Sequence, residues 1–440
     1  MSHKLSVVVP VLLLALSSSQ RSLIGEIQDL PVLEEQQKIW ASDGVVEDRF
    51  GFSIAMNREF LVVGAVGNDS SGVPNAGAAY VFRRDQNSGS WQEEAKLSVI
   101  GGDAYDVLGT FVAVRGTTVF VSAPQDDDWG VDSGAVYVYQ KDGDLNWIMT
   151  QKLYAPDHRS HHGFGGPLAV GGDLLVVGAS DDDLGFLAGA AYVFREDPLA
   201  LGTWSHLTKL TASEGEDLDY FGSSVAIDGD LIVVGADNDD HDGTRSGSAY
   251  VFERCHRCFS QFREVQKLVP PDAGEDFEFG GAVAVSDGWL AVGADSEGED
   301  PLRSGATYLY KRETGLWEIA TKLKAPDAAG ENRFGSDVDL GDAGLLIGAY
   351  GDGAGSAYLY QLAESQEDWL LKTKLRGSDS VWVDYFGGRL AMAGSHLAIA
   401  AELHGSPNGY RSGAAYTFDL GVFGDGFESG STAAWTATVP

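Results

Sequence analysis

Runs of apolar residues alternate with polar stretches rich in glycine and aspartate, and the pattern repeats every 52 to 58 residues. Each repeat begins at a Phe-Gly or Leu-Gly pair, and the pairs start at Phe50, Leu108, Phe164, Phe221, Phe279, Phe334 and Phe386. An apolar run that ends in small residues follows each pair, at 61–65, 119–124, 175–179, 232–236, 290–294, 345–349 and 397–401. Self-similarity at a fixed period of this length indicates a repeat architecture. The pattern therefore predicts seven copies of one structural unit.

Each copy carries two further strand signals. A segment of glycine, small residues and aromatic residues lies at 77–82, 134–139, 189–194, 247–252, 305–310, 355–360 and 413–418. Six copies then end with an aromatic residue five positions before a Lys-Leu pair, as Trp91 precedes Lys96. Short runs rich in Val, Ile, Tyr and Phe between turn residues predict strands, and no helical period of adequate length occurs. We therefore expect four strands in each copy.

The second and third strands of each copy are nearly continuous apolar runs. A sheet has this pattern when neighbours cover both of its faces. Radially stacked four-stranded sheets provide such neighbours, and short connections such as Gly229-Asp230 suit two-residue hairpins. The chain is therefore predicted to be an all-β, seven-bladed β-propeller with four antiparallel strands in each blade.

The two ends of the repeat region predict how the ring closes. The seventh copy stops at Phe418 without a Lys-Leu strand of its own, whereas the segment 33–40 precedes the first Phe-Gly pair. Its Lys38-Ile39 lies in the register of the Lys-Leu pairs. Because an open sheet edge invites aggregation, we predict that 33–40 completes the last blade. The propeller then spans 33–418, and 419–440 forms a C-terminal tail.

The first residues have the features of an export signal. Lys4 precedes an apolar run from Leu5 to Leu16, and Ala15 and Ser17 fit the small-residue rule for cleavage. The run is shorter than the ~18 apolar residues of a transmembrane helix, and no other segment approaches that length. We predict a signal peptide at 1–19, no transmembrane segment, and a secreted or cell-surface location.

Charge and motif content narrow the function classes. The chain has 65 Asp and Glu against 30 Lys and Arg, a formal net charge of −35. This charge repels polyanions, so nucleic acid and anionic membranes are not expected partners. Motifs of zinc proteases, serine hydrolases and P-loop proteins are absent from the sequence. We predict a monomeric, non-enzymatic binding module; the alternative is a hydrolase or lyase with its site in the propeller channel.

The repeated unit resembles the FG-GAP repeat of the integrin α-subunit propeller and of many secreted bacterial proteins. The resemblance rests on the Phe-Gly pairs, on second-strand runs such as LVVGA and on third-strand runs such as GAAYVF, and it covers 33–418. It implies extracellular adhesion or ligand binding, with a protein or glycan as partner and calcium stabilising some blades. The calcium signature of the family lies between the first and second strands. Those turns are too short here to contain it, so integrin-type calcium sites are not expected.

Acidic residues gather in the loops between second and third strands and in the linkers between blades. In a propeller both sets emerge on one face, which would carry more than half of the 65 acidic residues. Asn238, Asp240 and Asp242, followed by Gly243, have the spacing of the first half of a calcium loop, although no Glu occupies the twelfth position. We predict a calcium site there. The alternative is turn chemistry repeated in every copy, since Asp favours Asx turns.

Two smaller groups of residues remain. Cys255 and Cys258 are the only cysteines, and in an exported chain we predict that they form a local disulfide. The histidine-rich stretch 157–162 is either a transition-metal site or a solvated loop, and the second interpretation is favoured. The Lys residues of the Lys-Leu pairs and the fourth-strand Trp residues are expected to serve packing and local ion pairing.

Overall fold

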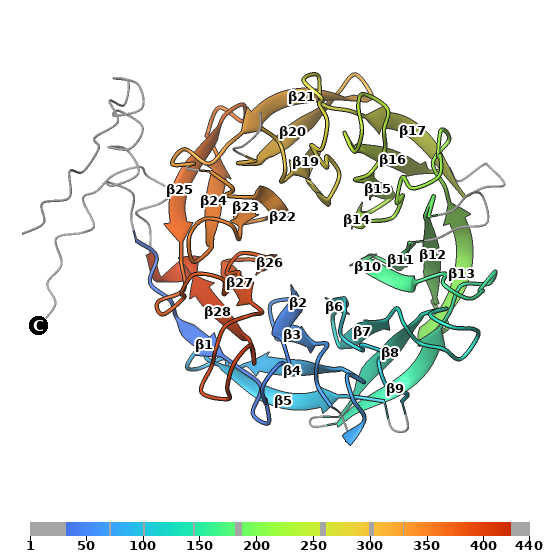
Figure 1. Cartoon of the computed structure of the whole chain (residues 1–440), viewed down its shortest axis with the longest axis vertical. Coiled ribbons are helices and arrows are strands. Elements are labelled where there is room, and N and C mark those ends of the chain that lie inside the picture. Colours follow the sequence, from blue (N-terminus) through green and yellow to red (C-terminus); the bar gives the residue numbers. More distant parts are fainter. Residues whose placement is uncertain are drawn as a thin grey trace, which may run out of the picture.

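The computed structural model describes residues 32–69, 72–99, 102–143, 146–180, 187–255, 261–298, 303–328 and 330–423. These residues form 28 strands in seven antiparallel four-stranded sheets, and the sheets stand as blades around a central axis (Figure 1). No α-helix occurs in the described part of the chain. The predicted all-β, seven-bladed propeller is confirmed.

The strands occupy equivalent positions in every blade. The innermost strands are β2 (Phe50–Met56), β6 (Val112–Arg115), β10 (Phe164–Gly171), β14 (Ser224–Asp228), β18 (Ala282–Ser286), β22 (Phe334–Gly341) and β26 (Arg389–Ala393). The second strands are β3 (Phe60–Ala65), β7 (Thr118–Ala123), β11 (Leu174–Ala179), β15 (Leu231–Ala236), β19 (Trp289–Ala294), β23 (Gly344–Ala349) and β27 (His396–Ala401). The third strands are β4 (Ala78–Arg84), β8 (Ala135–Asp142), β12 (Ala190–Asp197), β16 (Ser248–Arg254), β20 (Ala306–Glu313), β24 (Ser356–Leu362) and β28 (Ala414–Asp419). The outer strands are β5 (Trp91–Leu97), β9 (Asn146–Leu153), β13 (Ala200–Leu210), β17 (Phe262–Leu268), β21 (Leu316–Leu323), β25 (Trp369–Leu375) and β1 (Gln37–Ile39).

The cores lie between neighbouring sheets, which explains the continuous apolar runs. Every residue of β3, β7 and β11 is buried. The Phe that opens a blade packs edge-on against the aromatic residues of the third strand; the ring centroids of Phe50 and Tyr80 are 5.6 Å apart, and those of Phe50 and Phe82 are 5.9 Å apart. Each sheet therefore buries both faces, as the pattern predicted.

Glycine marks the places where neighbouring blades touch. Gly134, which precedes β8, has a φ of +78°, and a Cβ there would lie 1.9 Å from the carbonyl oxygen of Phe164 in the next blade. Gly165 has a φ of +97°, which residues with a Cβ rarely adopt. These two glycines let the backbones of consecutive blades meet, so the repeated Phe-Gly and Gly-small pairs are requirements of the ring itself.

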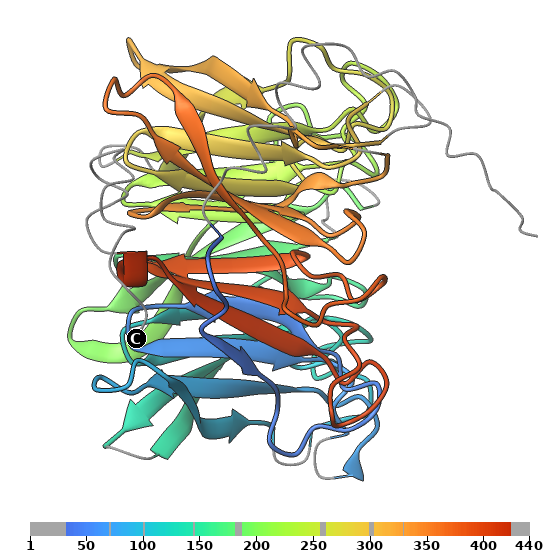
Figure 2. The same cartoon turned by 90° about the vertical axis from the view of Figure 1, so that its left-hand side faces the viewer.

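The ring closes through the segment that precedes blade one. Strand β1 pairs with β28 in the register Gln37↔Thr417, Lys38↔Tyr416 and Ile39↔Ala415, and Figure 2 shows β1 beside the strands of the last blade. The side chain of Gln37 also bonds the backbone of Trp91 in blade one, with Nε2 2.9 Å from O and Oε1 2.8 Å from N. The predicted closure is confirmed, and β1 links blade seven to blade one.

Two predicted segments lie outside the described residues. The signal peptide at 1–19 and residues 424–440 of the tail therefore stay predictions. The first residues of the tail form a 3-10 turn, Leu420–Phe423. Within the described residues no helix is long and apolar enough to cross a membrane.

Candidate binding face

One side of the ring carries two sets of segments. The first set is the loops between second and third strands, at 66–77, 124–134, 180–189, 237–247, 295–305, 350–355 and 402–413. The second set is the linkers between blades, at 40–49, 98–107, 154–163, 211–220, 269–278, 324–333 and 376–385. Backbone bonds hold the two sets together; for example, Tyr105 N donates to Pro74 O at 3.0 Å and Val107 N to Asn75 O at 3.2 Å. We call this side the loop face, and it lies to the right in Figure 2.

A carboxylate on this side joins a tyrosine to a lysine in every blade. In blade two, Asp126 accepts from Tyr137 Oη at 2.6 Å and from Lys152 Nζ at 2.6 and 2.8 Å. The lysine Nζ also lies 5.0 Å from the centroid of the tyrosine ring. The seven carboxylates with these contacts are Asp43, Asp126, Asp157, Asp239, Asp272, Asp327 and Asp379. The predicted ion-pairing role of the Lys-Leu lysines is confirmed, and these aspartates serve the fold.

The same contacts set the ionisation of these groups. Burial raises the pKa of Asp272, but hydrogen bonds from Lys322 and Tyr308 outweigh burial and leave the pKa below its ordinary value. Burial and the neighbouring Asp272 raise the pKa of Tyr308. Asp272 therefore stays ionised and Tyr308 stays protonated across the ordinary pH range, and both keep their hydrogen-bonding roles.

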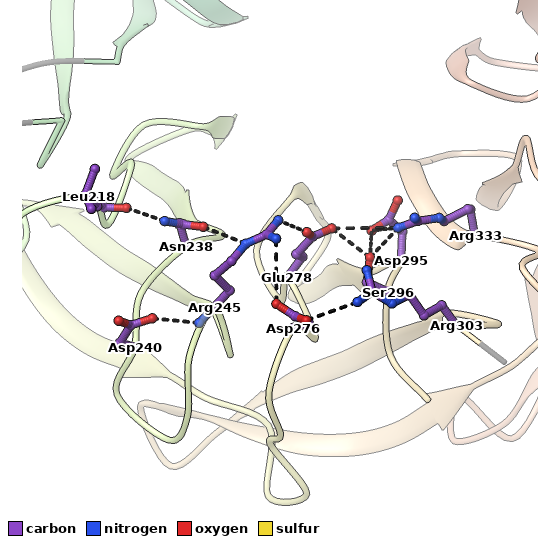
Figure 3. A network of polar contacts seen from close by, with 10 residues as sticks. All are labelled: Leu218, Asn238, Asp240, Arg245, Asp276, Glu278, Asp295, Ser296, Arg303 and Arg333. Atoms are coloured by element: carbon purple, nitrogen blue, oxygen red, sulfur yellow. Dashed lines mark hydrogen bonds and ion pairs between the residues drawn. The ribbon is translucent and has the colours of Figure 1, made fainter. Parts of the chain in front are cut away.

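The predicted calcium loop is organised around an arginine (Figure 3). Asn238 Nδ2 donates to Leu218 O at 2.7 Å, and Asn238 Oδ1 accepts from Arg245 Nε at 2.9 Å. Asp240 Oδ1 accepts from the backbone N of Arg245 at 2.6 Å. Asp242, which the figure does not draw, donates its backbone N to Ser246 Oγ at 3.2 Å. Oxygens of Asn238 and Asp240 are thus bonded to Arg245. The sequence analysis did not anticipate that Arg245 would lie in this loop. Calcium binding there stays a prediction.

The network continues across the mouth of the central channel. The guanidinium of Arg245 contacts Glu278 and lies 3.6 Å from Asp276. Ser296 Oγ donates to Glu278 Oε2 at 2.7 Å, and Arg333 Nη1 lies 3.7 Å from Asp295 Oδ1. Burial raises the pKa of Asp295; Glu278 adds to this effect and Arg333 opposes it. Blades four to six therefore place linked carboxylates and arginines at one sector of the mouth.

Two cavities occupy other sectors of the loop face. One of about 530 Å³ lies between blades two and four and includes Phe111, Pro124, His161 and Tyr220 in its lining. Another of about 280 Å³ lies where blades six, seven and one meet; its lining includes Phe52, Tyr350, Tyr385, Arg389 and Glu402. The rings of Tyr350 and Tyr385 are 5.2 Å apart. Walls that combine aromatic residues with polar and charged groups suit the binding of a small group or a side chain.

The histidine-rich stretch does not gather into a metal site. His162 is buried, and its Nε2 lies 3.0 Å from Tyr192 Oη. His158 packs on the exposed Trp129, with ring centroids 4.6 Å apart, and His161 Nδ1 lies 3.2 Å from Asp132. In the part of the chain that the structure describes, no three His, Cys, Asp or Glu side chains could hold a metal ion together.

The predicted disulfide cannot be placed in the same way. Cys255 follows β16 directly, but Cys258 lies outside the described residues. The pairing of these two cysteines therefore stays a prediction.

Comparison with known families agrees with the repeat geometry. The FG-GAP repeat matches seven times, at residues 33–82, 91–139, 147–194, 204–252, 262–310, 317–360 and 369–418. The chain belongs to the FG-GAP repeat family. The seven matches cover most of the chain and coincide with the seven blades. Repeats of this family are typical of extracellular proteins and often mediate binding or adhesion.

One solved structure supports the fold of this FG-GAP repeat protein, whereas no curated protein sequence matches it. A chain in the crystal structure of the mitotic checkpoint complex has a TM-score of 0.54 at 13% identity, covering 94% of this chain and 99% of that one. Sqt1 of Saccharomyces cerevisiae has a TM-score of 0.49 at 12% identity, covering 88% of this chain and 99% of its own. At 13% identity, the likeness to the chain of the mitotic checkpoint complex concerns the propeller fold alone.

Proposed function

We propose that this protein is a secreted or cell-surface, non-enzymatic binding or adhesion module that presents its loop face to a protein or glycan partner. The observation that carries the proposal is a contrast between positions of the repeat. The residues that build the ring recur in every blade, whereas those around the channel mouth differ from blade to blade. The residue before each Phe-Gly or Leu-Gly pair is Arg49, Val107, Gly163, Tyr220, Glu278, Arg333 or Tyr385 in turn. The residue after each second strand is Val66, Pro124, Ser180, Asp237, Asp295, Tyr350 or Glu402.

This contrast favours recognition over structure as the role of the mouth. A position that served the ring alone would keep one residue type, as the Lys-Leu lysines and third-strand tyrosines do. The mouth instead joins a cavity, a charged network and an aromatic pair on one scaffold. The net charge of −35 would attract basic partners over a distance. Calcium bound at loop-face carboxylates would order those loops for the partner.

The proposal can be tested by comparing the two faces of the ring. Purified protein is applied to a glycan array and to extracellular proteins, with calcium and with chelator, and any ligand found is titrated. We expect Tyr220→Ser, in the larger cavity, and Glu402→Arg, in the smaller one, to weaken binding at least tenfold. Arg58→Ala, in the exposed turn between β2 and β3, is the matched control and should bind normally. Equal loss in all three variants would contradict a loop-face site.

A hydrolase or lyase with a site at the channel is the second candidate. The observation that favours it is the Asp295 carboxyl, whose pKa burial raises, beside a second carboxylate, Glu278. Such a pair can divide acid and base roles between its members. A panel of polysaccharides and esters, incubated with the protein and with Asp295→Asn, tests this. Turnover that the substitution abolishes would support an enzyme.

A further inference from the structure

Blade six has a shorter connection on the loop face than the other blades. Its loop between β23 and β24 has six residues, 350–355, whereas the corresponding loops of the other blades have ten to twelve (Figure 1). The linker that follows blade six, 376–385, has the same length as the linkers elsewhere. Blade six therefore has a linker of ordinary length, but its loop between the second and third strands is about half as long as in the other blades.

The longer loops bond to their linkers in a regular way. In four linkers, two amides that are two residues apart donate to carbonyls of the preceding loop. The pairs are Glu47 N to Tyr410 O and Arg49 N to Arg411 O, Tyr105 N to Pro74 O and Val107 N to Asn75 O, His161 N to Val131 O and Gly163 N to Asp132 O, and Asp276 N to Thr244 O and Glu278 N to Arg245 O, all between 2.6 and 3.2 Å. These bonds leave little of the linker backbone open to another chain.

The equivalent amides after blade six are those of Val383 and Tyr385. Neither amide donates a hydrogen bond to another described residue. Both residues keep the positive φ of the covered linkers, 74° for Val383 and 61° for Tyr385, against 73° and 51° for Tyr105 and Val107. The backbone of this linker therefore already has the φ values of the linkers that bind a neighbouring loop segment.

Apolar side chains surround these open amides. Trp382 is 79% exposed and is flanked by the exposed Val381 and Val383. At the position of Trp382 the other linkers carry Val46, Ala104, Ser160, Asp217, Glu275 and Gly330. The ring of Tyr385 continues this surface towards Tyr350 and the cavity of about 280 Å³. Large apolar groups gathered on a monomer surface mark interaction sites. We call residues 350–355 and 381–385 the blade-six notch.

We propose that the blade-six notch binds a short polypeptide segment of a partner protein. The carbonyls of two consecutive residues of that segment accept from the amides of Val383 and Tyr385, as in the covered linkers, and an apolar side chain packs on Trp382. The occupant is a polypeptide because these amides are spaced to meet backbone carbonyls, as they do in four other linkers. Basic residues flank the apolar one, since the chain carries a net charge of −35. The inference rests on the proposed function and names the partner class.

The chain's own tail is a poorer occupant on geometric grounds. The 3-10 turn Leu420–Phe423 follows β28 and lies on the side of the ring away from the loop face (Figure 2). A partner segment has no such distance to cover.

The probe is a phage-displayed library of random linear twelve-residue peptides, selected against the mature chain. We expect the selected peptides to be apolar and basic, and to slow hydrogen exchange at the amides of Val383 and Tyr385. Trp382→Ser should weaken their binding at least tenfold. Leu199→Ser is the matched control, because Leu199 is 95% exposed in a hairpin away from the loop face. A graft of the eleven-residue loop 237–247 in place of 350–355 should also abolish binding by supplying the missing carbonyls.

Several results would overturn the proposal. These are the absence of any selected peptide, unchanged exchange at the two amides, or equal binding to Trp382→Ser and Leu199→Ser. Binding that appears only after removal of 424–440 would assign the notch to the tail. Dimers that Trp382→Ser dissociates would assign it to a second copy. Glycan or protein binding elsewhere on the loop face, with no peptide at the notch, would leave the proposed function standing and refute the notch alone.

Discussion

Substitution of Ile39 by alanine tests whether β1 holds the ring closed. Ile39 is 5% exposed and packs in a cluster with Phe50, Trp91 and Ala415 between blades seven and one. The substitution removes three buried carbons, worth about 2.4 kcal/mol at ~0.8 kcal/mol each, and the cavity left behind brings the cost to about 3 kcal/mol. At 1.36 kcal/mol per factor of ten, β1 would then detach more than a hundred times as often.

The matched control is Leu153→Ala in blade two. Leu153 is 3% exposed and ends an outer strand, as Ile39 does, but a hairpin ties its strand β9 to β8. Denaturant unfolding should show a similar loss of about 3 kcal/mol for both variants. Hydrogen exchange should accelerate locally in β28 only for Ile39→Ala, because β1 has no hairpin to its blade. Equal local acceleration in β8 for Leu153→Ala would refute the reasoning.

Three further predictions use charges that the structure locates. Lys152→Ala should lower the free energy of unfolding by about 3 kcal/mol, because the side chain of its partner Asp126 is only 4% exposed. Lys96→Ala should lower it by less than about 1 kcal/mol, because its partner Asp43 is 53% exposed. Denaturant titration measures both changes. Burial raises the pKa of Asp339 from 3.8 to about 7. The folded state therefore holds this proton more tightly than the unfolded state, and the stability that it contributes falls as the pH rises from about 4 to 7. Relative to Asp339→Asn, the wild type should lose up to about 3 kcal/mol in the free energy of unfolding between pH 5 and 8. Millimolar calcium should raise the melting temperature, and Asp240→Ala with Asp242→Ala should reduce that rise; an equal rise with sodium chloride of the same ionic strength would show screening only.

The ring was predictable because its requirements are local and repeated. Gly134 and Gly165 are glycines since the carbonyls of the next blade leave no room for a side chain, so the same residues recur wherever two blades meet. Closure followed from the same regularity, since Lys38-Ile39 occupies the register of a missing strand. A requirement repeated seven times can be recognised in the sequence without knowledge of the contacts.

The loop face was less predictable because its contacts are set by single side chains. Asp126 and Asp43 both bind the Tyr-Lys pair of a blade, yet one comes from a loop between strands and the other from a linker. Arg245 bonds oxygens of the predicted calcium loop although no spacing rule places an arginine there. The amide of Val383 has no partner among the described residues, although its linker has the same length as the others. Such features depend on which segments meet, and that is known only in three dimensions.

The pairing of β1 with β28 also has a consequence in time. Gln37 and Thr417 hydrogen-bond across 380 residues of sequence, whereas consecutive strands within the other blades are joined by connections of at most twelve residues. Six blades can form one after another as the chain is made, because each needs only its immediate neighbours. The first strand made must stay unpaired until the last third strand exists. During synthesis β1 and the edge of β28 therefore stay unpaired until the chain is nearly complete. In this interval the protein is most exposed to aggregation and to chaperone binding.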